Sequence, residues 1–415
     1  MENFTSRERV LKALNHEEPD RVPIDFGGSL VTGIMVHALD SLRKYLGLEY
    51  CPVKVFDVFQ MLGIVEMDLV KRFEVDVLPV EPKVQWFGLK RKNYKPWKLW
   101  DGTKVLMPEN FNIEKDSEGN LLLHSEGDFS KPIEGVMPEN GFYFDMPSIS
   151  KYELDYSPPP LEEIKKEEHL TSEELEFIGE KAENLRSTTD KALFLDQWGK
   201  IGLKWVGSIP NFLTLLYSDK NYVKDLFKIR TETALKNLEK LKKYLGENID
   251  IICLEGADYG SQDREMFSPD IFEELFLPYL KVQNNWIHKN TNWKSFQHIC
   301  GSIPNLLPLL IETEIDILNP IQTSAKGMDP EWLKKNFGEK LTFWGGGVDT
   351  QRTLPFGNVK DIQKEIKERI KIFAPGGGFV FSIIHNIQQG TPPENIVAVF
   401  DTVRNFGKYP IKNTI

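Results

Sequence analysis

The sequence predicts an α/β fold, a (β/α)8 TIM barrel with an inserted β-rich cap segment. Eight short apolar runs occur along the 415-residue chain, and segments with helical periodicity separate most of them. Strands that alternate with helices are typical of a parallel sheet with crossover helices, and eight such units close a barrel. A barrel needs about 250 residues, so the remaining residues predict insertions.

The expected strands are rich in Val, Ile, Leu and Phe, as buried parallel strands are. In chain order they are residues 21–27 (RVPIDFG), 74–80 (EVDVLPV), 192–199 (ALFLDQWG), 250–258 (DIICLEGAD), 295–301 (SFQHICG), 315–322 (IDILNPIQ), 341–349 (LTFWGGGVD) and 378–386 (GFVFSIIHN).

Amphipathic segments supply the expected crossover helices. They include residues 222–245, 269–288, 361–373 and 393–406. The last follows the sequence "GTPPENI", in which Thr391 is expected to cap the helix and Pro392 or Pro393 to lie in its first turn.

Residues 84–160 account for most of the surplus length. Their aromatic residues alternate with polar ones, and the turn sequences "DGT" and "SEGN" interrupt them. This pattern predicts β-hairpins that form a cap between the second and third barrel strands. The whole chain, residues 1–415, is then expected to be one barrel domain with this insertion. The highly charged residues 161–187 are expected to form solvated helix.

Composition restricts the function classes. The formal net charge is -11, and no dense Lys/Arg cluster with interleaved aromatic residues occurs, so nucleic acid is not an expected partner. No apolar run is long enough to span a membrane, and the first residues lack an apolar signal core, so we expect a cytoplasmic protein. The three cysteines, Cys51, Cys253 and Cys300, are too few for a disulfide framework.

The active site of a TIM barrel lies at the C-terminal ends of its strands. His298 and Cys300, two residues apart on an expected strand, project from the same face. An imidazole and a thiolate on one face suit zinc, with a third protein ligand and one open position. His385 and Glu255 are the alternatives for that third ligand. Otherwise His298 and Cys300 are packed core residues.

Other polar residues at the expected strand ends are candidates for catalysis or substrate binding. Glu255 and Asp258 are candidate general acids, although a carboxylate at a strand end can instead cap the next helix. The candidate substrate-binding residues are Glu81, Gln197, Trp198, Asn319, Gln322 and Asn386.

Five motifs occur along the chain: "SRERVLKALNHEEPDRVPIDFGG", "FSPDIFEELFLPYLK", "HICG", "WGGGVDT" and "GGGFVFSIIHNIQQGTPPENI". With these motifs the sequence resembles the uroporphyrinogen decarboxylase superfamily over nearly the whole chain. The resemblance implies a (β/α)8 barrel with one of two activities. Decarboxylases of this superfamily carry an arginine-rich loop after the first strand that pairs with substrate carboxylates. Here that place reads "DFGGSLVTGIM", without arginine, which disfavours porphyrinogen decarboxylation.

The other branch contains corrinoid-dependent methyltransferases, whose zinc site is a His-x-Cys-Gly motif and a distant cysteine. His298 and Cys300 match the motif, whereas His385 stands in place of the distant cysteine. The resemblance implies zinc and a partner corrinoid (cobalamin) protein as methyl acceptor. One thiolate and two imidazoles leave a positive centre, which suits a Lewis acid acting on an ether oxygen.

The expected function is therefore transfer of methyl from a small methoxylated, aromatic donor to the Co(I) of the corrinoid protein. Three alternatives remain open: transfer from a methylcorrinoid to a thiol or pterin, decarboxylation of a porphyrinogen, and a docking subunit without chemistry. Barrels that resemble this one often pair, so a homodimer is a further possibility.

Overall fold

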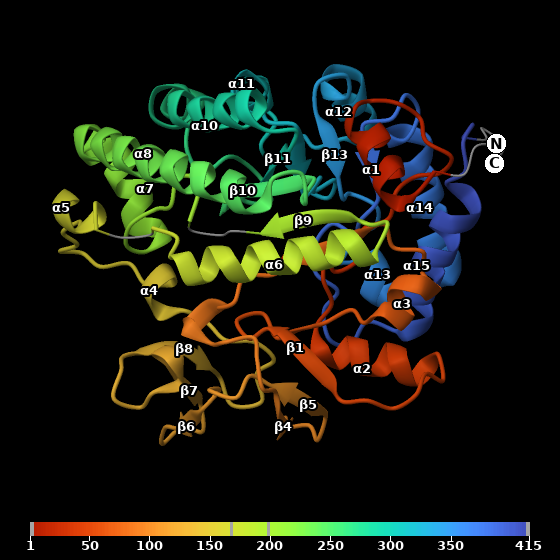
Figure 1. Cartoon of the computed structure of the whole chain (residues 1–415), viewed down its shortest axis with the longest axis horizontal. Coiled ribbons are helices and arrows are strands. Elements are labelled where there is room, and N and C mark those ends of the chain that lie inside the picture. Colours follow the sequence, from red (N-terminus) through yellow and green to blue (C-terminus); the bar gives the residue numbers. More distant parts are fainter. Residues whose placement is uncertain (1–3, 167–168, 197–199, 412–415) are drawn as a thin grey trace.

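The computed structural model describes residues 4–166, 169–196 and 200–411 (Figure 1). Within these residues, seven strands form one parallel sheet in the order β14-β13-β12-β11-β10-β9-β3. Their bounds are β3 Val77–Val80, β9 Ala192–Asp196, β10 Ile251–Asp258, β11 Lys294–Cys300, β12 Ile317–Asn319, β13 Thr342–Trp344 and β14 Phe379–Val380. The predicted TIM-barrel fold is confirmed.

The first expected strand, residues 21–27, closes the barrel without forming a regular strand. Asp25 N donates to Phe381 O at 2.9 Å on one side, and Asp76 N donates to Ile24 O at 2.8 Å on the other. Its bridge from Ile24 to Phe381 is isolated and is not continued into a regular ladder. The prediction of a full strand was wrong here, because Pro23 has no N–H to donate to a ladder.

The barrel interior is filled with large apolar side chains. Phe194, Phe296 and Trp344 pack together inside it, with Phe194 and Phe296 ring centroids 4.8 Å apart. Helix α1 (Ser6–Leu14) closes the N-terminal end of the strands, where Gly378 N donates to Ala13 O at 2.8 Å. Since Phe296 points inward, alternation along β11 also turns His298 and Cys300 inward.

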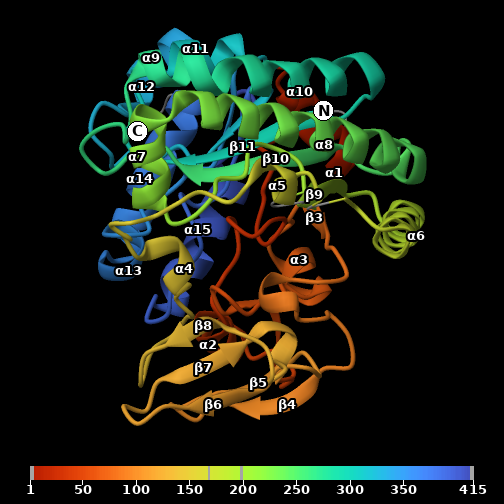
Figure 2. The ribbon, with the colours of Figure 1, turned by 90° about the vertical axis from the view of Figure 1, so that its left-hand side faces the viewer.

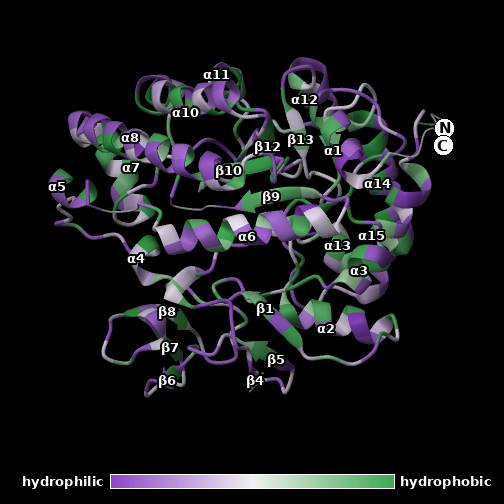
Figure 3. Ribbon diagram, viewed as in Figure 1, coloured by the Kyte–Doolittle hydropathy of each residue, from purple (hydrophilic) through white to green (hydrophobic). Residues whose placement is uncertain are grey.

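Helices surround the sheet, and Figure 3 shows their hydrophilic residues on the outside and hydrophobic residues on the strands. In chain order the remaining helices are α2 Val36–Tyr45, α3 Met67–Arg72, α4 Pro147–Ser150, α5 Leu161–Ile164, α6 Ser172–Thr188, α7 Ile209–Ser218, α8 Lys220–Leu245, α9 Pro269–Ile271, α10 Leu277–Asn290, α11 Leu307–Glu312, α12 Pro330–Phe337, α13 Thr353–Phe356, α14 Val359–Phe373 and α15 Pro393–Phe406. Among the described residues, no helix combines the length and the apolar character needed to cross a membrane.

Two details of the helices differ from expectation. The segment expected as one helix from residue 269 contains a π-helical turn, η3 (Phe272–Phe276), between α9 and α10. At α15, Pro392 occupies the N-cap and no side chain caps the helix, so Thr391 does not have the capping role expected of it.

The cap lies beside the barrel, between β3 and β9 in the sequence (Figure 2). It contains β4 Lys95–Lys98, β5 Lys104–Met107, β6 Ile113–Lys115, β7 Leu121–His124 and β8 Ile133–Met137, with the short 3-10 turns η1 Trp86–Gly88 and η2 Ser125–Gly127. Strands β4 and β5 join β1 (Val53–Asp57) and β2 (Leu62–Gly63) in one sheet of the described residues. The participation of β1 and β2 was not expected from the sequence.

Candidate metal centre and active site

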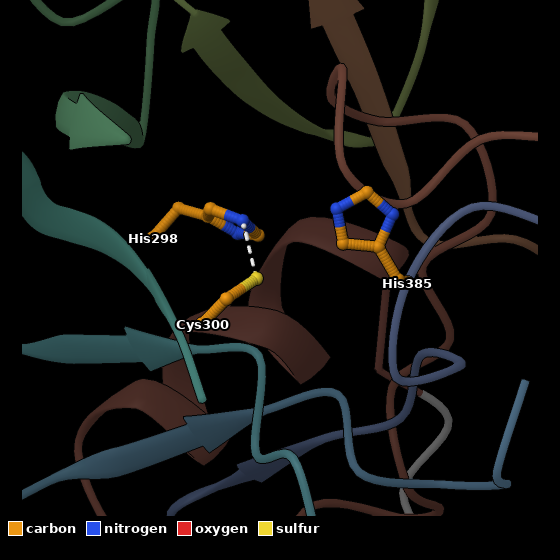
Figure 4. Close-up of side chains that lie close together, drawn as sticks. All are labelled: His298, Cys300 and His385. Atoms are coloured by element: carbon orange, nitrogen blue, oxygen red, sulfur yellow. Dashed lines mark hydrogen bonds between the residues drawn. The ribbon is translucent and has the colours of Figure 1, made fainter. Parts of the chain in front are cut away.

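Three candidate ligands meet at the C-terminal end of the barrel (Figure 4). His298 and Cys300 come from the end of β11, and His385 comes from the loop after β14. One ligand atom from each residue lies within 4.8 Å of the others. Cys300 Sγ is 3.2 Å from His298 Nε2. The structure thus brings together the three residues that the sequence singled out.

A buried hydrogen-bond chain orients the His298 ring. Asn319 Nδ2 donates to the carbonyl of Trp344 at 2.9 Å, so its Oδ1 faces His298 Nδ1 at 2.6 Å. Because an amide oxygen only accepts, Nδ1 carries the proton and Nε2 presents its lone pair toward Cys300. Parallel pairing places the two residues opposite each other on β11 and β12. Histidines that bind a metal ordinarily donate such a hydrogen bond from the ring nitrogen that does not bind the metal.

The donor set fits zinc. Ligand bonds of 2.0 to 2.3 Å in a tetrahedron place the ligand atoms about 3.5 Å apart, close to the observed Sγ to Nε2 separation of 3.2 Å. Burial, together with the neighbouring His385, lowers the pKa of His298 to about 3. Burial also lowers the pKa of His385 to about 4. Both rings are therefore neutral at pH 7, as ligands must be.

Asn319→Ala is expected to weaken zinc binding about 10- to 100-fold, because the His298 ring loses the acceptor that orients it. Titration of the metal-free protein against a competing chelator measures this affinity. Asn395→Ala is the matched control, since Asn395 is another buried amide, whose Nδ2 donates to the carbonyls of Leu354 and Gly357. Equal zinc affinities of the two variants would exclude the orienting role of Asn319.

The turn after β11 is fixed by backbone and side-chain contacts. Gly301 has φ 99° and donates its N–H to Gln322 Oε1 at 2.8 Å. Gly260 N donates to Cys300 O at 3.1 Å. These bonds hold the backbone that presents the Cys300 thiol.

A cavity of about 390 Å³ opens at the end of β10, the strand that pairs with β11. Asp258, at the exposed end of β10, lines it and pairs with Cys300 in the sheet register. Partial burial raises the pKa of Asp258, and a hydrogen bond with the Cys300 thiol opposes this effect. Burial and the Asp258 carboxylate raise the pKa of the thiol. The other walls are mostly apolar, including Trp86, Met146, Ile149, Leu203, Trp205 and Leu254.

The cap contributes to this cavity through Trp86 and through Met146 and Ile149 at α4. A planar apolar molecule would bury most of its surface between these side chains and the end of β10. The cavity thus offers an apolar binding space that reaches the candidate metal centre at Asp258, the neighbour of Cys300 on the adjacent strand.

The remaining predicted residues are placed as follows. Glu81 lies in a second part of the barrel mouth and pairs with Lys181. Asn386 accepts from Gly33 N and donates to Leu30 O and Gln60 Oε1. Gln197 and Trp198 lie outside the described residues, as does the side chain of Glu255, whose backbone pairs with Gln297 in the sheet.

Asn319, Gln322 and Asn386 are therefore engaged in internal hydrogen bonds that position the loops of the site. A substrate-binding role stays a prediction for them, as it does for Glu81, Gln197 and Trp198. Asp57 received no role from the sequence, and Asp196 was noted only as one of the polar residues at the strand ends. Asp196 ends a barrel strand, which was a usable signal, whereas Asp57 lies on β1, a strand that the sequence pattern did not indicate.

Comparisons with known proteins agree with this architecture. Residues 206–406 match the family described as Uroporphyrinogen decarboxylase (URO-D). A curated uroporphyrinogen decarboxylase from Prochlorococcus marinus is 27% identical over 240 residues, which are 56% of this chain. The match spans 64% of the length of that relative.

The solved structure of a methyltransferase from Methanosarcina mazei shares the fold, with a TM-score of 0.55 and 16% identity. That alignment covers 97% of this chain and 99% of the methyltransferase. Residues 206–406 are thus similar to the uroporphyrinogen decarboxylase family, and nearly the whole chain shares the fold of the methyltransferase.

Proposed function

We propose that this protein is a zinc-dependent methyltransferase that moves a methyl group from a methoxylated aromatic donor to the Co(I) of a corrinoid protein. The observation that carries the proposal is the convergence of His298, Cys300 and His385, together with a largely apolar cavity that ends at Asp258 next to Cys300. The similarity to a methyltransferase structure supports the fold on which this site is built.

The composition of the ligand set favours one direction of methyl transfer, removal of methyl from an ether rather than its delivery to a thiol. One thiolate and two neutral imidazoles would hold Zn²⁺ with a net positive charge, and a bound zinc would act as a Lewis acid that stabilises negative charge on an ether oxygen as its methyl group leaves. Two thiolates would neutralise that charge and favour activation of a substrate thiol instead. The presence of His385 therefore favours demethylation of an ether.

The chain's own residues would bind and orient the donor. Trp86, Trp205 and Leu254 provide apolar walls for an aromatic ring. Asp258 lines the same cavity next to Cys300, so its carboxyl group is placed to give a proton to the departing oxygen. Asn319 keeps His298 in the required orientation.

The reaction balances without a further oxidant. The oxygen–methyl bond of the donor breaks, and its electron pair stays on the oxygen, which takes a proton to become a phenol. Co(I) of the partner supplies the electron pair of the new cobalt–methyl bond. The partner must approach the barrel mouth, because the ligands lie at the C-terminal ends of the strands.

The proposal is tested with zinc-loaded protein, chemically reduced free cobalamin and 2-methoxyphenol or 1,2-dimethoxybenzene. We expect methylcobalamin and the matching phenol in equal amounts, followed by absorbance and chromatography. His298→Ala and metal-stripped protein should both reduce the rate to that of the protein-free mixture. The proposal is refuted if zinc-loaded protein forms the methylated corrinoid no faster than the protein-free mixture does, both with free cobalamin and with corrinoid proteins. Demethylation of methylcobalamin by a thiol would instead establish the reverse direction.

A further inference from the structure

A second cavity, of about 290 Å³, lies in the barrel mouth between β3, β9 and the cap. It shares Trp86 and Lys200 with the apolar cavity, so the two adjoin. Asp196, at the end of β9, lines it and is only 5% exposed. The aromatic side chains of Phe56, Trp86 and Phe87 form part of its wall.

Buried polar atoms around this cavity lack partners among the described residues. Asp196 Oδ1 and Gln85 Nε2 belong to side chains that line the cavity, and Asp57 Oδ1 belongs to a buried side chain whose charge acts on Asp196. Glu81 Oε2, which also has no hydrogen bond, forms an ion pair with Lys181. The oxygen atom beside each of the other three atoms already accepts a backbone N–H. The donors are Leu30 N to Asp196 Oδ2 at 3.1 Å, Gln60 N to Asp57 Oδ2 at 2.6 Å, and Val58 N to Gln85 Oε1 at 2.8 Å. These bonds fix the side chains and leave one hydrogen-bonding atom of each without a protein partner.

Such atoms are costly to bury. An unpaired buried polar group costs about 1 to 3 kcal/mol, and native structures contain few of them. Two such atoms in the wall of one cavity, with a third on the nearby Asp57, indicate that a polar ligand or water completes their hydrogen bonds.

The charges around the cavity indicate the sign of the ligand. Glu81 pairs with Lys181, and Lys200 Nζ lies 3.9 Å from Glu174 Oε1. The Arg91 guanidinium donates to the carbonyls of Phe56, Pro82 and Val84. When Asp57 and Asp196 are both ionised, Arg91 balances one of them, and the described side chains around the cavity keep one uncompensated negative charge.

We propose that this cavity binds a primary ammonium group on a small aromatic molecule, with Asp196 as its acceptor and the charge of Asp57 close behind it. The ammonium group supplies the missing positive charge and up to three N–H donors. Phe56, Trp86 and Phe87 pack against the ring and favour a nearby cation. Gln85 Nε2 can donate to an oxygen atom on the same ligand. This proposal does not rest on methyl transfer or on zinc.

The protonation of the two carboxyl groups gives the site a pH dependence. Burial raises the pKa of Asp196 to about 7, with a contribution from the nearby Asp57 charge. Burial raises the pKa of Asp57 to about 6. Below these values a proton neutralises each carboxylate, so ammonium binding should strengthen from pH 5 to pH 8 and release protons. The other charged groups around the site are Glu81, Lys181, Glu174, Lys200 and Arg91.

The test uses the full chain and calorimetric titration with benzylammonium, benzyl alcohol and benzoate. At pH 8 we expect benzylammonium to bind at least 10-fold more tightly than benzyl alcohol, and benzoate not to bind. Benzylammonium affinity should fall at least 10-fold at pH 5. Zinc-loaded and chelator-treated protein should bind it equally, which separates this site from the metal centre.

Asp196→Asn should weaken benzylammonium binding at least 10-fold, because the amide keeps an acceptor for Leu30 N but loses the charge. Asp57→Asn repeats the test if the first variant fails to fold, as judged by circular dichroism. Asp263→Asn removes the same charge from an exposed residue outside the cavity and should have no effect. Absence of benzylammonium binding, preference for benzoate, or an unchanged affinity in a folded Asp196→Asn or Asp57→Asn protein would overturn the proposal and leave a water-filled cavity or an anion site.

Discussion

Cys300→Ser is expected to abolish stoichiometric zinc binding. Zinc sites in small domains bind with about 10 to 16 kcal/mol shared among their ligands, so loss of the thiolate should weaken affinity by about 1000-fold or more. The serine hydroxyl does not replace it, because it stays protonated at neutral pH and is a poor zinc ligand. Elemental analysis of protein purified with added zinc and without chelators measures the effect.

Cys51→Ser is the matched control for this substitution. Cys51 is exposed and lies outside the candidate metal centre, so its replacement should leave the zinc content unchanged. His298→Ala and His385→Ala should lose zinc as Cys300→Ser does, whereas Glu255→Gln should retain it. Loss of zinc from Glu255→Gln together with its retention in His385→Ala would make Glu255 the third ligand.

Gly301→Ala is expected to lower the stability of the fold strongly. Gly301 has φ 99°, a conformation that L side chains rarely adopt, and an added Cβ would lie 2.0 Å from Gly260 O. Both partners of that clash are backbone, so the turn behind Cys300 must move. We expect a loss of at least about 3 kcal/mol in the free energy of unfolding, together with lost zinc binding in any folded fraction.

Gly390→Ala measures the cost of a positive φ alone, without a steric clash. Gly390 also has a positive φ, 78°, but an added Cβ there would have no atom within 4 Å. Its replacement should cost only about 1 kcal/mol, measured by denaturant unfolding. If the two variants were equally stable, the close approach of Gly301 to Gly260 would not be a structural requirement.

The sequence was most informative where structure depends on local pattern. Apolar runs located β9, β10 and β11, and their alternation placed His298 and Cys300 on one face before any geometry was known. The same reasoning overestimated the length of the strand expected at residues 378–386, because only Phe379 and Val380 have regular ladder pairing. His385 reaches the site from the loop beyond them, and loop paths are not set by periodicity.

Long-range pairing explains what the sequence did not reveal. Asn319 orients His298 because β11 and β12 pair in that register, whereas its position at a strand end suggested contact with substrate. Similarly, β1 joins β5 across about fifty residues of sequence, and Asp57 at the end of β1 lies close enough to Asp196 for its charge to raise the pKa of that carboxyl group. Such contacts depend on tertiary packing, which a single sequence pattern does not encode.

The central claim is that His298, Cys300 and His385 hold a zinc ion with one position open to the donor. X-ray absorption at the zinc edge of the purified protein tests it most directly. We expect one sulfur ligand at about 2.3 Å and two imidazole nitrogens at about 2.0 Å, with a fourth, light-atom ligand that changes when 2-methoxyphenol is added. A protein that binds no zinc, or a zinc spectrum without sulfur in its coordination, would contradict the claim.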